Sequence, residues 1–236
     1  MSHAAESSSL TIPLHIGYIV DGNRRWAKKH GIPKYEGHLA GYNALKDVVI
    51  ESVEAGVKFV SVYVFSTENW KRDTDEVRYL MKLVHRLMTK DLKELIDRDI
   101  RALFIGSRAE LGADIVEAIE KAEEASAHCS RGTAVVCLNY GGQREIVEAT
   151  KAIIDAGVKT EQITEESFAK YLYAPEVPAV DVVVRTSGEH RLSNFMLWRA
   201  AYSEFIFIDK YWPDMRPEDV HEIIKEYNNR QRRFGN

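Results

Sequence analysis

Ile16–Lys34 reads IGYIVDGNRRWAKKHGIPK and combines an apolar strand, a tight turn and the start of a helix. The apolar run Ile16–Val20 stops at Asp21–Asn23, and good helix formers follow. A helix start offers unpaired backbone N–H groups and the positive end of a dipole, and both favour a phosphate group. Five basic side chains share the turn and helix with one acid, Asp21: Arg24, Arg25, Lys28, Lys29 and Lys34. We interpret the stretch as a diphosphate cradle in which the Asp21 carboxylate is placed to hold Mg²⁺.

An ordinary turn followed by a solvated helix would give the same pattern. Asp-Gly-Asn is common in turns, and Arg and Lys on a first helix usually face solvent. The stretch also lacks the Gly-x-x-x-x-Gly-Lys motif of a P-loop. Spacing alone favours neither interpretation, so the rest of the chain must decide.

Composition and charge narrow the classes of function. Hydrophobic residues make up 45% of the 236 residues and charged residues 29%, which is typical of a globular protein. The net charge of −4 argues against broad nucleic-acid binding, so no nucleic-acid partner is expected. No apolar run approaches the roughly 20 residues of a membrane span. Two cysteines are too few for a disulfide framework. We expect a cytoplasmic protein with a disordered tail over residues 1–12 and one domain over residues 13–236.

Strand-like and helix-like segments alternate along the chain. Strands are predicted at residues 14–20, 57–65, 100–105, 133–139, 180–184 and 205–208. Residues 73–96 predict one long helix that opens with Asp73 and Glu76 as a capping box. The alternation predicts an α/β fold with a mainly parallel six-stranded sheet and helices on both faces. Polar segments follow four strand ends and could therefore line one rim of the sheet.

Those polar segments are Asp21–Lys28 (DGNRRWAK), Phe65–Trp70 (FSTENW), Asn139–Gly142 (NYGG) and Arg185–Phe195 (RTSGEHRLSNF). They resemble the signature blocks of the cis-prenyltransferases, most closely of the undecaprenyl diphosphate synthases. The blocks stand in the family's order, and the resemblance runs from about His15 to Gly235. No single block is specific, but several long blocks in order are a strong signal.

The resemblance implies an Mg²⁺-dependent homodimer that adds isopentenyl diphosphate units to farnesyl diphosphate with new Z double bonds. The implied product is a Z,E-polyprenyl diphosphate such as undecaprenyl diphosphate, the lipid-carrier precursor for cell-wall glycan synthesis. The resemblance also implies one catalytic domain with an apolar tunnel between sheet and helices. Release of such a product suggests peripheral contact with the inner face of the membrane.

The resemblance assigns roles to residues of each block. Asp21, Asn69 and His38 would be catalytic, and the proton acceptor stays open among them. Arg25 and the backbone of Gly22–Arg25 would hold the allylic diphosphate, aided by Lys34 and Arg72. Other expected substrate contacts are Asn23, Arg24, Trp26, His38, Ser66, Thr67, Glu68 and Trp70. The isopentenyl diphosphate would be held by Arg185, Arg191 and Ser193, and by Arg233 and Gly235 from a tail that reaches across the dimer. The metal ligands would be Asp21 with Glu204 and His190 of the partner subunit.

Apolar residues of the predicted long helix and of two strands are candidates for the tunnel wall and, equally, for plain core. They are Leu80, Val84, Leu87, Met88, Val62 and Val135. The chain also departs from the family pattern: Ser187 replaces a Gly, and is mildly strained if that position needs a positive φ. Lys34 stands where relatives often carry Arg, and Asp73 replaces a Pro.

Three alternatives remain beside the main interpretation. The chain could be an idle subunit that partners an active enzyme, although Asp21, Arg25, Asn69 and Glu204 argue against this. It could perform the same chemistry with another product length. It could be an unrelated phosphate-binding or RNA-binding module, which would have no use for Asp21 beside the cradle. A trans-prenyltransferase is disfavoured because the sequence contains no Asp-Asp pair to begin a DDxxD motif.

Overall fold

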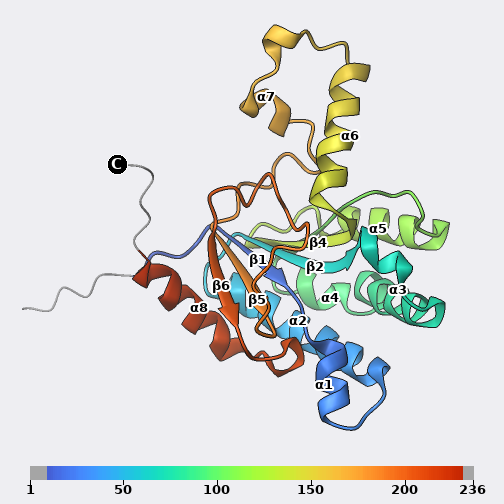
Figure 1. Cartoon of the computed structure of the whole chain (residues 1–236), viewed down its shortest axis with the longest axis vertical. Coiled ribbons are helices and arrows are strands. Elements are labelled where there is room, and N and C mark those ends of the chain that lie inside the picture. Colours follow the sequence, from blue (N-terminus) through green and yellow to red (C-terminus); the bar gives the residue numbers. More distant parts are fainter. Residues whose placement is uncertain (1–9, 231–236) are drawn as a thin grey trace, which may run out of the picture.

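A six-stranded parallel sheet forms the centre of the structure, a computed structural model that describes residues 10–230 (Figure 1). The strands are β1 (His15–Ile19), β2 (Phe59–Ser66), β3 (Ile100–Ile105), β4 (Gly132–Tyr140), β5 (Val182–Thr186) and β6 (Glu204–Ile208). Their order is β3-β4-β2-β1-β5-β6, and every pair is parallel. The sequence prediction of the sheet is confirmed, with each strand end within two residues of the expected place.

Eight helices and three short 3₁₀ turns are found in the described part of the chain. They are α1 (Asn23–Lys29), α2 (Lys34–Glu54), η1 (Thr67–Lys71), α3 (Thr74–Thr89), α4 (Leu92–Ile96), α5 (Ala113–Ser126), α6 (Gly142–Asp155), η2 (Thr160–Gln162), α7 (Glu165–Ala169), η3 (Trp212–Asp214) and α8 (Pro217–Asn229). The prediction of one long helix from Asp73 to Ile96 is wrong, because α3 ends at Thr89. The break lies beside Asp91, whose carboxylate accepts hydrogen bonds from Tyr42 and Arg86.

The two faces of the sheet are covered differently. Buried side chains of α2, α3, α4, α5 and α8 form one core with the first face. The second face is covered mainly by an irregular segment that contributes Val177, Val180, Phe195, Met196 and Ala200. The predicted parallel sheet flanked by helices is confirmed, and most of the helical cover lies on the first face, because apolar residues before and after β5 bury the second face without forming a helix.

Alternation along the strands decides which side chains face the helices. Val62 of β2 and Val136 of β4 are paired in register and belong to the core beneath the helices. Tyr63 and Val135 point to the opposite face. The prediction of Val135 as a tunnel residue is wrong, since a tunnel between sheet and helices must lie on the other side.

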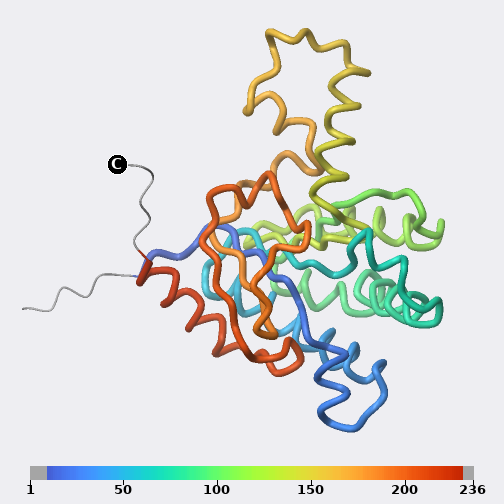
Figure 2. Tube along the Cα trace, viewed as in Figure 1, coloured from blue at the N-terminus to red at the C-terminus, as the bar shows by residue number. Residues whose placement is uncertain are grey.

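An arm made by α6, η2 and α7 projects from the body of the molecule. The first and last described segments lie next to each other on one side of the body (Figure 2). Thr11 and Asn228 exchange hydrogen bonds of 2.7 and 2.8 Å, which tie the start of the chain to α8. Residues 1–9 of the predicted tail lie outside the described chain. Within residues 10–230, no helix is long and apolar enough to cross a membrane.

Candidate active site

Two polar cavities lie side by side at the carboxyl ends of the central strands. The α1 cavity, of about 510 Å³, is lined by Val20, Asp21, Gly22, Asn23, Arg24, Arg25, Lys28, His38, Tyr63, Val64, Asn69, Arg72 and Leu80. The β5 cavity, of about 500 Å³, is lined by Ile19, Val20, Asp21, Tyr63, Ser66, Glu68, Asn69, Arg72, Arg185, Ser193 and Asn194. The residues common to both cavities are Val20, Asp21, Tyr63, Asn69 and Arg72. The rim expected from the strand ends therefore holds two adjoining sites.

Gly22 lets the chain turn from β1 into α1 at the α1 cavity. Its φ of 109° is in the left-handed region, and a Cβ there would lie 2.9 Å from the Tyr211 ring. Gly22 is the N-cap residue of α1, and no side chain of the described structure caps this helix start. The turn thus brings backbone N–H groups and the Asp21 carboxylate to the same wall of the cavity.

Asp21 lies between two arginines that belong to different cavities. Its Oδ2 accepts from Arg185 Nη2 at 2.9 Å, and its Oδ1 is 3.1 Å from Arg25 Nη2. Burial alone would raise the pKa of Asp21, but the hydrogen bonds and charges of Arg185 and Arg25 outweigh it and lower the pKa. The carboxylate is therefore ionised at neutral pH, at the place where the cavities meet.

The loop after β5 forms the far wall. Arg185 is buried, donates to Ser193 Oγ at 2.8 Å and also to the Arg191 carbonyl. It belongs to β5 and not, as expected, to the loop that follows. Ser187, the departure from the family's Gly, has a φ of 79°. The positive φ that was the condition for mild strain at Ser187 is therefore present. Arg25 Nη1 donates to Glu189 of the same loop at 2.7 Å and so helps to hold the loop in place.

A buried carboxylate that was not predicted as a site residue, Glu76, lies behind the α1 cavity. It accepts from His38 Nε2 at 3.2 Å and Arg72 Nη1 at 3.4 Å, and Lys34 Nζ is 3.1 Å away. The capping-box prediction is half right: Asp73 accepts from the N–H groups of Asp75 and Glu76. The Glu76 side chain instead turns inward to these cations. Burial lowers the pKa of His38 although Glu76 opposes this effect.

A second group missed from the sequence, Asn139, positions η1. Its φ of 47° turns the end of β4, and its Oδ1 accepts from Trp70 Nε1 at 2.8 Å. Its amide donates to the Ser107 and Ala109 carbonyls on the neighbouring loop. Trp70 is thereby anchored behind Asn69, whose Oδ1 accepts from the Ser66 N–H at 3.2 Å. The block Asn139–Gly142 (NYGG) marked this position in the sequence, but it did not indicate that Asn139 anchors Trp70.

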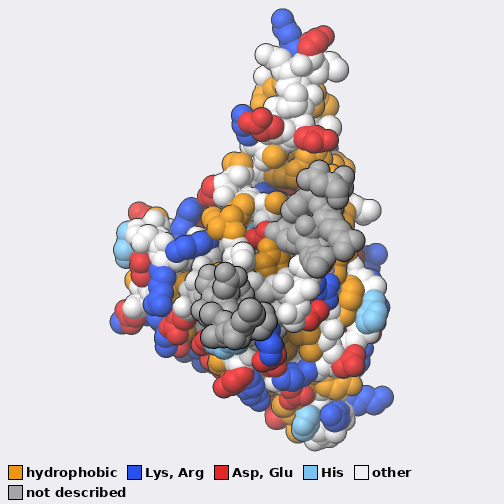
Figure 3. Space-filling view, turned by 90° about the vertical axis from the view of Figure 1, so that its left-hand side faces the viewer, with side chains coloured by type: hydrophobic (Ala, Val, Ile, Leu, Met, Phe, Trp, Pro, Cys, Tyr) orange, Lys and Arg blue, Asp and Glu red, His pale blue; other side chains and the backbone are white. Residues whose placement is uncertain are grey.

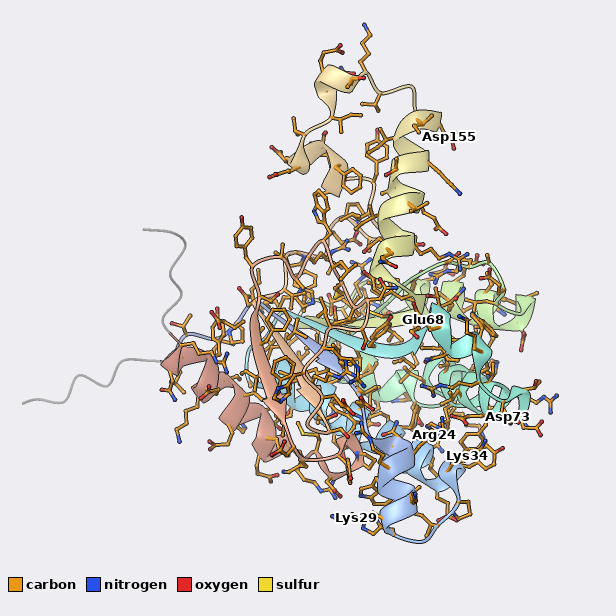
Figure 4. All side chains as sticks on the ribbon, viewed as in Figure 1. Arg24, Lys29, Lys34, Glu68, Asp73 and Asp155 are labelled. Atoms are coloured by element: carbon orange, nitrogen blue, oxygen red, sulfur yellow. The ribbon has the colours of Figure 1, made fainter. Side chains whose placement is uncertain are left out.

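Several residues predicted to bind substrate do not line either cavity. Trp26 donates to Asp214 at 2.7 Å, and Trp70 packs edge-on against Phe65. Lys34 is bound between Glu76 and Asp73, as Figure 4 shows for Lys34 and Asp73. Thr67 and Arg191 are also absent from both linings. Of the two adjacent lysines of the predicted cradle, Lys28 lines the α1 cavity, whereas Lys29 lies at the far end of α1 from Arg24 (Figure 4).

The predicted metal ligands are not brought together within one chain. Glu204 begins β6 and pairs in register with Val182, at the opposite end of the sheet from Asp21. His190 stacks on Phe207 with 4.6 Å between ring centroids. No group of three or more His, Cys, Asp or Glu side chains suited to a metal occurs among residues 10–230. A single carboxylate does fit Mg²⁺, which usually takes one or two carboxylates and completes its shell with water and substrate phosphate. Arg233 and Gly235 lie outside the described residues.

An apolar pocket opens from the α1 cavity between α2 and α3. Residues shared with that cavity are Val20, Asn23, His38, Val64 and Leu80, and the further walls are Gly41, Tyr42, Leu45, Leu83, Val84, Leu87 and Trp212. Of the tunnel candidates, Leu80, Val84 and Leu87 therefore line it, whereas Met88 and Val62 are core residues beside it. Its free volume is about 50 Å³. This is less than the roughly 150 Å³ that holds one benzene molecule, so a long chain needs its walls to move.

Comparison with known proteins shows similarity over nearly the whole chain. The model of the family described as "Putative undecaprenyl diphosphate synthase" matches residues 19–235. The chain is 42% identical to an isoprenyl transferase of Thermotoga maritima, covering 96% of this chain and 98% of the relative. It is 41% identical to a ditrans,polycis-undecaprenyl-diphosphate synthase of Micrococcus luteus, specific for (2E,6E)-farnesyl diphosphate, covering 95% and 92%. The crystal structure of lavandulyl diphosphate synthase from Lavandula x intermedia, in complex with dimethylallyl diphosphate, matches with a TM-score of 0.92 at 33% identity, covering 95% and 99%.

Proposed function

The chain belongs to the undecaprenyl diphosphate synthase family and is a prenyltransferase that makes a polyprenyl diphosphate, and we propose that it condenses isopentenyl diphosphate units onto farnesyl diphosphate with Mg²⁺. The observation that supports this reaction is the meeting of two polar cavities at Asp21, Asn69 and Arg72. One of these cavities opens directly onto an apolar pocket. Two diphosphate substrates and one growing hydrocarbon chain require such a combination.

The α1 cavity is the proposed site of the allylic diphosphate. Arg24, Arg25 and Arg72 line it, and arginine donates fork-like to phosphate oxygens. Lys28 adds a fourth cation to the same wall. This cavity shares Val20, Asn23, His38, Val64 and Leu80 with the lining of the apolar pocket, so the prenyl tail of the allylic substrate has a place to go.

The β5 cavity is the proposed site of isopentenyl diphosphate. Arg185 and Ser193 form a bonded pair on its wall, and Asn194 and Ser66 add further polar groups. Of the described residues, Val20 alone lines both this cavity and the apolar pocket, and such a slight connection suits a short substrate. Arg191 and the Arg233–Gly235 tail remain proposed contacts on the strength of the family resemblance.

The residues between the cavities suit the chemical step. Departure of the allylic diphosphate leaves positive charge on carbon and adds negative charge to the leaving oxygens. Arg25 and Arg72 are placed to stabilise that leaving group. Bound Mg²⁺, held by Asp21 and the substrate phosphates, would supply further Lewis-acid stabilisation. Of the two polar cavities, His38 lines the α1 cavity and not the β5 cavity, so we assign it to allylic binding, whereas Asn69 lines both proposed substrate sites.

The growing hydrocarbon chain would occupy the apolar pocket between α2 and α3. Each buried five-carbon unit contributes about 3–4 kcal/mol at roughly 0.8 kcal/mol per CH₂ group, so affinity rises with length. Affinity therefore does not end elongation, and the reach of the opened pocket or slow release must do so. We propose an undecaprenyl-like length. Because such a product is a lipid, we also propose peripheral contact with the inner face of the membrane during release, from a cytoplasmic enzyme.

We propose that two copies of the chain form a homodimer through the face that carries the edge strand β6 and the base of the arm. Figure 3 shows hydrophobic side chains gathered on this face. Tyr202 is 81% exposed and Phe207 38%, and such exposure is costly for large apolar groups in water. A partner docked here would offer Glu204 and His190 of the partner subunit to the shared metal site that the family resemblance implies.

The test is incubation with farnesyl diphosphate, labelled isopentenyl diphosphate and Mg²⁺, followed by chromatography of the products. We expect a ladder of Z-polyprenyl diphosphates that disappears when Mg²⁺ is chelated and returns when it is restored. Absence of any Mg²⁺-dependent elongation would refute the proposal. A chain that turns over nothing alone, yet stimulates an active prenyltransferase, would instead support the idle-subunit alternative.

A further inference from the structure

We propose that Glu76 is a positioning residue that holds the cationic wall of the allylic site in its binding geometry. The inference rests on the proposed function, because it concerns how the α1 cavity binds a diphosphate. Glu76 lines neither polar cavity, so it acts through its neighbours and not through substrate contact.

Glu76 joins three segments that are separate in the sequence. Its carboxylate contacts Lys34 and His38 in the first two turns of α2, and Arg72 at the end of η1. Glu76 itself belongs to the first turn of α3. Two of the three partners, His38 and Arg72, line the α1 cavity. One carboxylate therefore sets the relative position of two cavity-lining groups that come from different elements.

The burial of Glu76 indicates a function beyond a surface ion pair. Its side chain is 2% exposed, and an isolated carboxylate at that depth would be strongly disfavoured. Desolvation would raise the pKa of Glu76, but the hydrogen bond from Lys34, the charge of Arg24 and the hydrogen bond from His38 lower it, so the group is ionised. Arg24 also borders the cavity, which makes Glu76 the counter-ion of a cluster of cations.

The bond to His38 also orients the imidazole. In the neutral ring, Nε2–H donates to Glu76, which leaves Nδ1 as an acceptor. This Nδ1 is buried and has no hydrogen-bond partner among the described residues. His38 lines both the α1 cavity and the apolar pocket, so this unpaired acceptor belongs to a residue at their junction.

Glu76 further connects the diphosphate site to the wall of the pocket. The same helix carries Leu80, Leu83, Val84 and Leu87 into the apolar pocket. The ion pairs of Glu76 hold the start of that helix against α2 and η1. The position of the hydrocarbon wall is thereby fixed relative to the cations that receive the diphosphate.

Two roles for Glu76 predict opposite signs in a binding experiment. A negative charge beside a diphosphate site weakens anion binding by repulsion, so removing a bystander carboxylate should tighten it. Removing a positioning carboxylate should loosen binding, because Arg72 and His38 lose their common anchor. Glu76→Gln keeps the size of the side chain and removes only the charge, so it separates the two roles.

The experiment compares Glu76→Gln with the wild-type enzyme and with Asp75→Asn. Asp75 is the neighbouring acid of the same helix turn, and it pairs with exposed Arg78 at 2.8 Å. Calorimetric titration with inorganic pyrophosphate and with farnesyl diphosphate, without isopentenyl diphosphate, measures binding directly. We expect Glu76→Gln to bind both about tenfold more weakly, the effect of losing one charge-assisted contact, and Asp75→Asn to bind like the wild type. The KM for farnesyl diphosphate should rise more than the KM for isopentenyl diphosphate.

Unchanged or tighter binding by folded Glu76→Gln would overturn the proposal. Where thermal unfolding shows that this variant does not fold, Glu76→Asp, which keeps the charge and draws it back by one methylene, takes its place. Weaker pyrophosphate binding by Glu76→Asp then supports positioning, and wild-type binding refutes it. A wild-type enzyme that binds pyrophosphate but elongates nothing would refute the proposed function alone.

Discussion

Replacement of Ser187 by Gly should stabilise the enzyme. Ser187 has a φ of 79° in a loop that contacts Arg25. The backbone in this region brings Cβ close to the neighbouring carbonyl oxygen, which costs an L-residue roughly 1–2 kcal/mol. The hydroxyl of Ser187 is buried and has no hydrogen-bond partner in the described chain, and such a group costs about 1–3 kcal/mol.

The net gain is smaller than the sum of these costs. Glycine makes the unfolded chain more flexible, which opposes folding by about 0.5–1 kcal/mol. We expect Ser187→Gly to raise the free energy of unfolding by about 1 kcal/mol, or Tm by about 2–4 °C for a chain of this size. Ser187→Ala is the matched control, because it removes the hydroxyl and keeps the Cβ.

Urea unfolding of the three proteins, followed by circular dichroism at one pH, measures the difference. Ser187→Gly should exceed Ser187→Ala, since only glycine relieves the backbone strain. A glycine variant that is less stable than the alanine variant would show that positive φ carries no cost here, and the reasoning would fail.

Three further outcomes are expected. Asp21→Asn keeps the shape of the side chain but removes the charge between Arg25 and Arg185. We therefore expect kcat to fall by roughly 10²–10³ while Tm stays within a few degrees. Near-full turnover in a steady-state assay would show that Asp21 has no part in the mechanism. Burial lowers the pKa of His15 to about 4, so the fold favours the neutral ring. Stability should therefore be full above the unfolded pKa of about 6.5 and fall by up to about 3 kcal/mol as pH drops towards 4; a urea midpoint that shows the same pH slope in His15→Gln would contradict this. Leu83→Trp should fill the apolar pocket and shorten the polyprenyl products on chromatography, whereas an unchanged ladder would place the growing chain elsewhere.

The strands and their rim could be predicted because their signals are local. Ile100–Ile105 is apolar except for Arg101 and lies between Asp99 and Gly106, and it forms β3 with the predicted bounds. The Asp-Gly turn at Asp21 and Gly22 and the Asp73 N-cap follow from the short-range chemistry of those residues. Once the strands are known to be parallel, their carboxyl ends must meet at one edge. Most of the two cavities follows from that rule.

The partners of polar and apolar side chains could not be predicted in the same way. The spacing of Asp73 and Glu76 predicts a capping box, but Glu76 reaches Lys34 and His38, about 40 positions earlier in the chain. Val62 and Val135 are both apolar strand residues, and only the register of β2 with β4 places them on opposite faces. Trp26 resembles a substrate contact until η3 supplies Asp214 as its partner.

The sequence by itself therefore determined the parallel sheet, the acid and cations at its rim and, through the resemblance, the family. Only the tertiary structure decided that Glu76 is the hidden counter-ion of the rim and that the apolar pocket lies between α2 and α3. The physical reason is range. Periodicity and turn chemistry act over a few residues, whereas the burial of a charge or the wall of a pocket depends on segments brought together by folding.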